Sequence, residues 1–121
     1  MTAEDLSSLL ARLRHALDTE EFVDEFSCLE EDYYVTARAL AREAIVGLDV
    51  TEPADRERFL VAKEVYDLCD DIHRARWRKV HALAVRLVGA DPIEALPDNL
   101  LAAERDYLNS VIRIREIREQ G

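Results

Sequence analysis

The feature that most constrains the fold is the run from Pro53 to Val88, which contains no glycine and no proline after its first residue. Apolar side chains recur in this run every three to five residues, the spacing that places them on one face of an α-helix. These residues are Val61, Val65, Leu68, Ile72, Ala75, Val80, Leu83 and Leu87. The pattern predicts one helix of about 50 Å. A chain of 121 residues does not need such a helix to close a compact core, so the length predicts surface left over for a partner.

Two helices are predicted before the long one. Leucines at helical spacing predict a helix from Ala3 to Leu17. Ser27 and Glu30 match the S-x-x-E capping box and predict a second helix from Leu29 to Val46, which Gly47 can end in a left-handed conformation. The face of the second helix carries small and apolar residues that would let a neighbouring helix come close, namely Tyr33, Ala37, Leu40, Ala41 and Ala44.

Cap and loop residues mark the remaining boundaries. Thr51 and Pro53 suit the cap and first turn of the long helix, and Gly89 ends it. A fourth helix is predicted from Asp98 to Glu119, with an apolar stripe of Leu101, Leu108, Val111 and Ile112 that Ile114 and Ile117 would extend. In the connections, the side chains expected to fold onto the core are Phe22, Phe26, Ile93 and Leu96. No alternating strand pattern occurs, so the predicted fold class is all-α, a single-domain antiparallel bundle of about four helices over residues 1–121.

Charge is distributed unevenly along the chain. The formal net charge is −10, yet residues 72–90 contain five basic residues and no acidic residue, against 19 acidic and 7 basic in residues 1–71. This basic band comprises Arg74, Arg76, Arg78, Lys79 and Arg86, with His73 and His81 among them. Duplex DNA is bound by neutralising its phosphates with Lys and Arg, so a strongly acidic chain favours a protein partner over direct DNA binding.

No catalytic constellation is predicted. His73 and His81 are eight residues apart, whereas two histidines that bind one metal from one helix prefer a spacing of three or four. We therefore expect no catalytic residue, no metal ligand and no cofactor. A nucleotide-handling all-α enzyme with an acidic metal cluster at Glu64, Asp67, Asp70 and Asp71 is only a minor alternative, because acidic residues at this spacing usually form a solvated helix face.

The termini and cysteines indicate a cytoplasmic protein. Met1 is followed by acidic residues and not by a basic and apolar run, so no signal peptide is predicted. No apolar run approaches the ~20 residues of a membrane span. Cys28 and Cys69 are not in a C-x-x-C pair and are expected to be small buried residues in a reducing compartment.

The basic band contains the best candidates for an interface. Arg74, Arg78 and His81 share one flank of the predicted helix, with Trp77 beside them, and Trp and Arg are enriched at binding hot spots. Two interpretations are open: the arginines form ion pairs within the chain while Trp77 packs inside, or the group meets a partner. Successive helical residues point about 100° apart, so one of two adjacent tyrosines is expected near an interface. The predicted interface residues are Tyr33, Tyr34, Arg74, Trp77, Arg78 and His81.

Three segments of the chain resemble a known family. The sequence L-E-E-D-Y-Y at Leu29 to Tyr34 is similar to the L-P-x-D-F-Y signature in the helical domain of archaeal GINS subunits of the class in which that domain comes first. I-H-R-A-R-W-R-K-V-H-A-L-A at Ile72 to Ala84 resembles the long-helix segment, and L-L-A-A-E-R-D-Y-L at Leu100 to Leu108 resembles the opening of the last helix. The chain departs from the family pattern at Glu30, Tyr33, Ala102 and Ala103.

The resemblance implies a function and a set of partners. Family members usually add a small β-rich domain, and this sequence stops at Gly121 after the helical part, so we expect either that this domain is absent or that the sequence is a piece of a longer protein. The resemblance implies a non-enzymatic scaffold of the replisome that joins the MCM helicase to a RecJ-like protein. It also implies a tetramer, built from one chain or with a sister GINS subunit through the long helices. A small all-α regulator or adaptor, which would bind a protein or nucleic acid through the basic band at 73–86, is the alternative.

Overall fold

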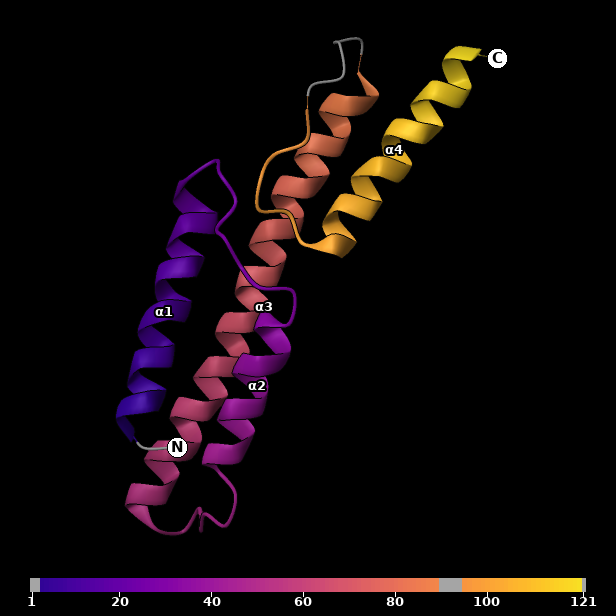
Figure 1. The fold of residues 1–121 in the computed structure, drawn as a ribbon. Helices are drawn as coiled ribbons and strands as arrows, with labels where there is room; N and C mark the ends of the chain where they lie inside the picture. The colour runs from indigo at the N-terminus through magenta and orange to yellow at the C-terminus, as the bar shows by residue number, and fades with distance from the viewer. Residues whose placement is uncertain (1–2, 90–94, 121) are drawn as a thin grey trace.

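The computed structural model describes residues 3–89 and 95–120, and these form four α-helices with no strand (Figure 1). The helices are α1 (Ala3–Phe22), α2 (Tyr33–Ala44), α3 (Pro53–Val88) and α4 (Ala102–Gln120). The all-α fold class with one long central helix is confirmed. No helix in the described ranges is long and apolar enough to cross a membrane.

The long helix α3 organises the other three. Figure 1 shows α1 and α2 beside its first half and α4 beside its second half, and the two hydrophobic clusters follow this division. Pro53 occupies the first turn of α3, where its missing N–H costs nothing, and the N–H of Gly89 donates to the carbonyl of Arg86 where the helix ends. Each half of α3 therefore has different neighbours.

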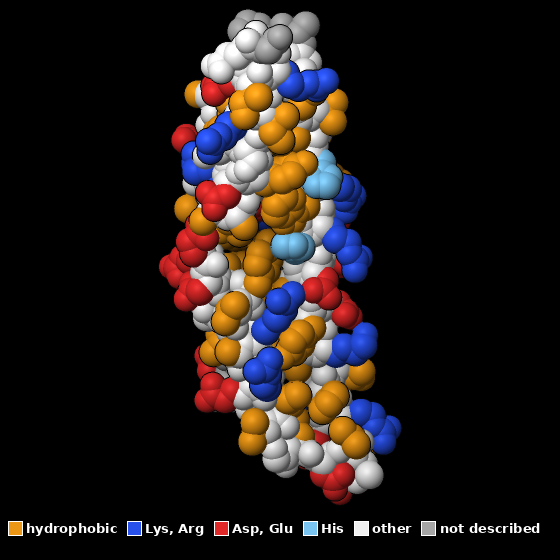
Figure 2. All heavy atoms as spheres, turned by 90° about the vertical axis from the view of Figure 1, so that its right-hand side faces the viewer, with side chains coloured by type: hydrophobic (Ala, Val, Ile, Leu, Met, Phe, Trp, Pro, Cys, Tyr) orange, Lys and Arg blue, Asp and Glu red, His pale blue; other side chains and the backbone are white. Residues whose placement is uncertain are grey.

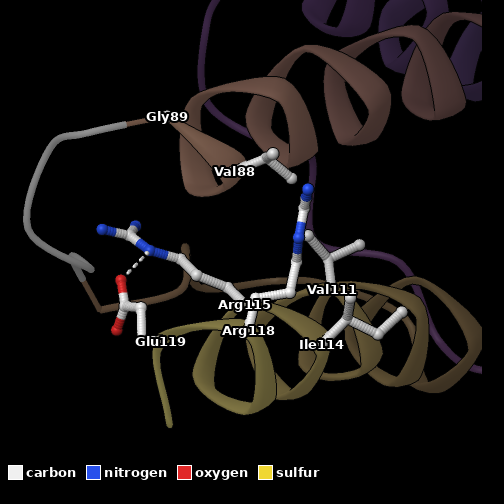
Figure 3. A pocket seen from close by; sticks show the side chains of 7 residues that line it. All are labelled: Val88, Gly89, Val111, Ile114, Arg115, Arg118 and Glu119. Carbon is white, nitrogen blue, oxygen red and sulfur yellow. Dashed lines mark hydrogen bonds and ion pairs between the residues drawn. The ribbon is translucent and has the colours of Figure 1, made fainter. Parts of the chain in front are cut away.

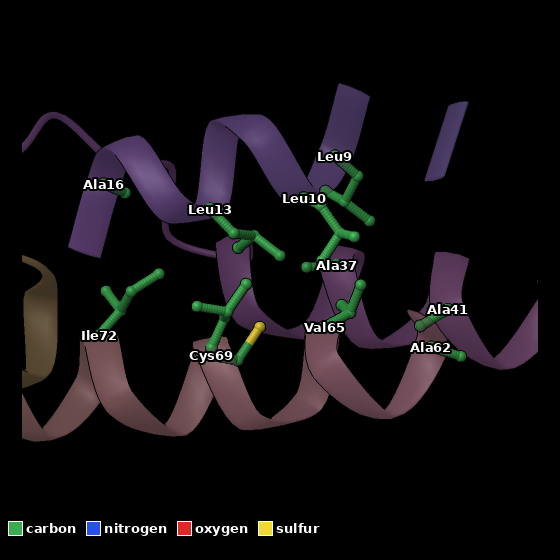
Figure 4. Close-up of a cluster of buried hydrophobic side chains, with 11 residues drawn as sticks. Leu9, Leu10, Leu13, Ala16, Ala37, Ala41, Ala62, Val65, Cys69 and Ile72 are labelled. Carbon is green, nitrogen blue, oxygen red and sulfur yellow. The ribbon is translucent and has the colours of Figure 1, made fainter. Parts of the chain in front are cut away.

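The first hydrophobic cluster lies between α1, α2 and the first half of α3 (Figure 4). Leu13, Val65 and Ile72 are fully buried in it, and Ala37 and Ala41 are the small residues of α2 that face α3. Small side chains let α2 approach closely, which confirms the face predicted for that helix. At the end of α2, Gly47 has a φ of 76°, the left-handed conformation expected there.

A second cluster lies between the other half of α3 and α4. Its buried members include Phe26, Val80, Leu87 and Leu108, and Leu96 packs against it as expected. Ile93 lies outside the described residues. On α4, Ile114 and Ile117 do not extend the stripe, because both side chains are about 60% exposed. The hydrophobic core along α3 is thus made of two clusters.

Several local predictions were wrong. The first helix continues to Phe22, whose side chain is exposed and does not plug the core. The second helix begins at Tyr33, because Ser27 donates its hydroxyl and its backbone N–H to Glu20 of α1 and forms no capping box. Cys28 is exposed, and of the two cysteines only Cys69 is buried as expected.

The predicted cap of α3 and the predicted start of α4 also need correction. Glu52 and not Thr51 is the N-cap of α3, since the Thr51 hydroxyl donates to Asp49. The fourth helix begins at Ala102 and not at Asp98. Its first turn is stabilised by Glu104, whose side chain accepts a hydrogen bond of 2.8 Å from the N–H of Leu101.

Candidate functional site

Arg76 is the largest fully buried side chain among the described residues and the centre of a charged network. Its guanidinium donates two hydrogen bonds to the Glu104 carboxylate, at 2.9 Å from Nε and 2.7 Å from Nη2. A further bond of 2.9 Å reaches Glu20. The backbone carbonyls of Ser27 and Asn99 also accept bonds from Arg76, at 2.9 and 2.8 Å, and the Ser27 hydroxyl oxygen accepts a longer one at 3.4 Å. One side chain of α3 is therefore bonded to α1, to the α1–α2 connection and to the start of α4.

Glu20 is held in its charged form by the same network. Burial by itself raises the pKa of this carboxyl group, but hydrogen bonds from Ser27 and Lys79 and the charge of Arg76 together lower it. Lys79 donates to Glu20 at 3.0 Å, and Phe26 lies under both cations, with the Arg76 Cζ 5.1 Å from the ring centroid. Two buried carboxylates are thus matched by two cations, which is the condition under which buried charges are tolerated.

Because of this network, the basic band is not a continuous basic surface. Arg76 and Lys79 face inward and are bonded to the chain's own carboxylates, so they do not belong to a basic surface. Arg74, Arg78 and Arg86 are exposed. Arg74 lies 3.7 Å from Asp71, whereas Arg78 makes no ion pair with any described residue. The positive charge that remains for a partner is smaller than the sequence indicates.

A row of aromatic rings runs along α3 on the side where α2 and α4 both begin. Tyr34 contacts His73 edge to face at 5.5 Å between ring centroids, and His73 is followed by Trp77 at 6.1 Å. Trp77 then contacts both His81 at 5.9 Å and Tyr107 at 5.6 Å. We call Tyr33, Tyr34, His73, Trp77, His81 and Tyr107 the aromatic row.

The aromatic row is open to solvent on one side. In Figure 2 histidines lie among hydrophobic side chains in the middle of this face, with basic side chains along the adjoining edge. His73, His81 and Tyr107 are exposed, whereas Trp77 is half-buried against the second cluster. Trp77 therefore packs in part against the core, as the first interpretation expects, and contact of this group with a partner stays a prediction.

Four of the six predicted interface residues belong to the aromatic row, and two do not. Tyr33, Tyr34, Trp77 and His81 lie in it, while Arg74 and Arg78 lie one step round α3 on its outer face. Tyr34 is the inner of the two tyrosines. Its hydroxyl is buried and has no hydrogen-bond partner among the described residues, and burial raises the pKa of this phenol.

Sequence reasoning missed Arg76, Glu104 and Tyr107, although a signal was present. Arg76 lies four residues after Ile72 and four before Val80, so it falls on the buried stripe of α3. Glu104 lies four residues before Leu108 in the same way. A charged residue in phase with a buried stripe is the pattern that predicts an internal ion pair.

The acidic residues of α3 do not gather into a metal site. Glu64, Asp67, Asp70 and Asp71 each lie against a basic side chain, respectively Arg14, Lys63, Arg38 and Arg74. Among the described residues, no group of three or more His, Cys, Asp or Glu side chains is placed to hold a metal ion. These carboxylates behave as a solvated and ion-paired face.

A hollow of about 520 Å³ lies at the far end of the α3–α4 pair (Figure 3). Val88 lines it from α3, and Val111 and Ile114 line it from α4. Arg115 bridges the two helices, because it donates to the Leu87 carbonyl at 2.7 Å and to Glu119 at 3.1 Å. We assign this hollow no ligand.

Comparison with protein-family models, curated proteins and solved structures finds no match to this chain.

Proposed function

We propose that this chain is the helical domain of a GINS-like scaffold that acts in DNA replication and has no catalytic activity of its own. One observation carries the proposal: the three segments that resemble archaeal GINS subunits meet at a single place in the fold. Tyr34 of the first segment contacts His73 of the second, and Arg76 and Trp77 of the second contact Glu104 and Tyr107 of the third. Segments far apart in the sequence thus support one another structurally.

The proposed role is to join the MCM helicase to a RecJ-like protein, with the chain acting as a homo-oligomer or together with a sister subunit. The aromatic row is the proposed contact surface. Its exposed histidines and Tyr107 offer rigid rings beside a half-buried Trp, a composition that suits a protein hot spot. In this role the chain would associate with the nucleoid through the replisome.

Direct binding of nucleic acid through the basic band is the less favoured function. Arg76 and Lys79 are bonded internally, and the net charge of the chain is −10. Arg74, Arg78 and Arg86 remain as exposed cations of the band. So few phosphate contacts would give weak and strongly salt-dependent binding.

A pull-down with a matched control tests the proposed contact surface. We expect His81→Ala/Tyr107→Ala to reduce capture of MCM or the RecJ-like protein about tenfold or more, because these rings are exposed contacts of the aromatic row. The control His15→Ala/Phe22→Ala removes one exposed histidine and one exposed aromatic ring from α1 and should leave capture unchanged. Circular dichroism establishes that both variants remain helical. Equal capture by both variants would contradict the assignment of this surface.

A further inference from the structure

The second half of α3 is covered less completely than the first. The first hydrophobic cluster joins α3 to both α1 and α2, whereas in the second cluster α4 is the one other helix among the described residues (Figure 1). The helix α4 runs parallel to α3, because the bond from Arg76 to Glu104 and the bond from Arg115 to the Leu87 carbonyl both join residues 28 apart in the sequence. Three packed helices enclose their apolar faces, but a pair leaves a groove along its open side.

Two stripes of side chains with the same spacing border this α3–α4 groove. Intervals of four, three and four residues keep side chains on one face of a helix. On α3 the stripe comprises Trp77, His81, Ala84 and Val88, and on α4 it comprises Tyr107, Val111, Ile114 and Arg118. The stripes meet at one end where Trp77 contacts Tyr107, and at the other end Val88 and Ile114 line the hollow (Figure 3). The aromatic row and the hollow are therefore the two ends of one groove about 16 Å long.

The α3–α4 groove combines exposed apolar side chains with positive charge. Val88 and Ile114 are 54% and 58% exposed. Figure 2 shows hydrophobic side chains from the histidines toward the upper end, with basic side chains among them. Arg78 lies on α3 three residues before His81, Arg118 lies at the far end of the groove, and neither pairs with a described carboxylate. Since α3 has no acidic residue from Ile72 to Val88, the groove favours a negatively charged partner.

We propose that the α3–α4 groove binds one amphipathic helix of another protein, with an apolar stripe against the groove and Asp or Glu on its flanks. This helix would give the second half of α3 the three-helix packing that α1 and α2 give the first half. A helix of about 12 residues spans the groove, which is the length of α2. Apolar anchors at helical spacing are the usual contacts of a helix bound in a groove. The inference rests on the proposed function in taking the aromatic row as a contact surface, and it adds the hollow and the chemistry of the bound segment.

Three synthetic peptides of about 14 residues test the chemistry of the bound segment. The first has leucines at intervals of four, three and four residues and Glu on both flanks. The second has Lys in place of each Glu, and the third contains the residues of the first in an order that breaks the stripe. Fluorescence anisotropy measures binding of each labelled peptide to the full chain at low salt. We expect a Kd of about 10–100 µM for the first peptide, and at least about tenfold weaker binding of the other two.

Variants of the chain locate the binding. Val88→Ser/Ile114→Ser removes apolar contacts and is expected to weaken binding of the acidic peptide about tenfold or more. Arg78→Glu/Arg118→Glu should weaken it to a similar extent and strengthen binding of the Lys peptide, because the charge at the groove is reversed. The matched controls, which change exposed residues of α1, of α2 and of the turn after α2, are Val35→Ser/Val46→Ser and Arg12→Glu/Arg42→Glu. The controls should bind the acidic peptide like the unmodified chain, and circular dichroism establishes that all variants are folded.

Equal binding of the three peptides, or equal effects of the groove variants and the controls, would overturn the inference. Light scattering of the chain without peptide tests a second copy as the occupant. A dimer at about 100 µM that Val88→Ser/Ile114→Ser dissociates would place a second copy in the groove and would also overturn the inference. No replication protein enters these measurements. Peptide binding without capture of MCM or the RecJ-like protein would therefore contradict the proposed function alone, and capture without peptide binding would contradict this inference alone.

Discussion

Replacing Arg76 with alanine is expected to lower the free energy of unfolding by about 3–5 kcal/mol. The guanidinium makes bonds to Glu20, Glu104 and two backbone carbonyls, and all of it is buried. Its removal leaves Glu104 without its ion-pair partner and Glu20 with Lys79 alone. An unpaired buried carboxylate costs more than the lost contacts, so the effect should exceed that of an ordinary core truncation.

Urea unfolding followed by circular dichroism measures this effect, with Arg74→Ala as the matched control. Arg74 is an exposed arginine on the same helix, and its removal should change stability by no more than about 0.5 kcal/mol. The double variant Arg76→Ala/Glu104→Ala should lose less unfolding free energy than the two single variants lose in sum, since it removes both partners. Equal stabilities for Arg76→Ala and Arg74→Ala would show that the network does not hold the helices together.

Replacing Leu108 with alanine is expected to cost about 2–5 kcal/mol. Leu108 is fully buried between α4 and the second half of α3, where α4 has α3 as its neighbouring helix. The truncation removes apolar contacts and leaves a cavity that the two helices close only in part. Ile114→Ala on the same helix is the control, because that side chain is 58% exposed and should change stability by about 0.5 kcal/mol or less.

Amide hydrogen exchange locates the effect of Leu108→Ala. We expect the protection of α4 to fall more than that of α1 and α2, which pack on the other half of α3. A uniform loss of protection over all four helices would contradict the division of the core into two clusters. Equal stabilities of the Leu108→Ala and Ile114→Ala variants would contradict the packing of α4 itself.

The sequence predicts those parts of the fold that are decided locally. The long helix has the predicted ends because Pro53 suits a first turn and Gly89 a last one, and its apolar stripe is buried as its spacing requires. The predicted start of α2 was wrong because a contact with α1 competes with the local capping signal. Ser27 matches a capping box by spacing, yet Glu20 accepts both its hydroxyl and its N–H.

The sequence also predicts only part of the candidate site, because residue type is visible locally and contacts between distant segments are not. Trp77 and the tyrosines stand out by residue type, and four predicted interface residues do lie in one row. Arg76 has the same residue type as Arg74 and Arg78, and only its position in the helical repeat separates it from them. Its partner Glu104 comes from another helix, so composition alone does not reveal that the charge is internal.

The proposed scaffold role is tested most directly by assembly of purified proteins. The chain, an MCM helicase and a RecJ-like protein from the same genome are combined in pairs and all together, and their association is followed by size-exclusion chromatography with light scattering. The account predicts that MCM and the RecJ-like protein elute as one complex only when the chain is present and included in it. Separate elution of all three proteins, or co-elution of the other two without the chain, would contradict the account.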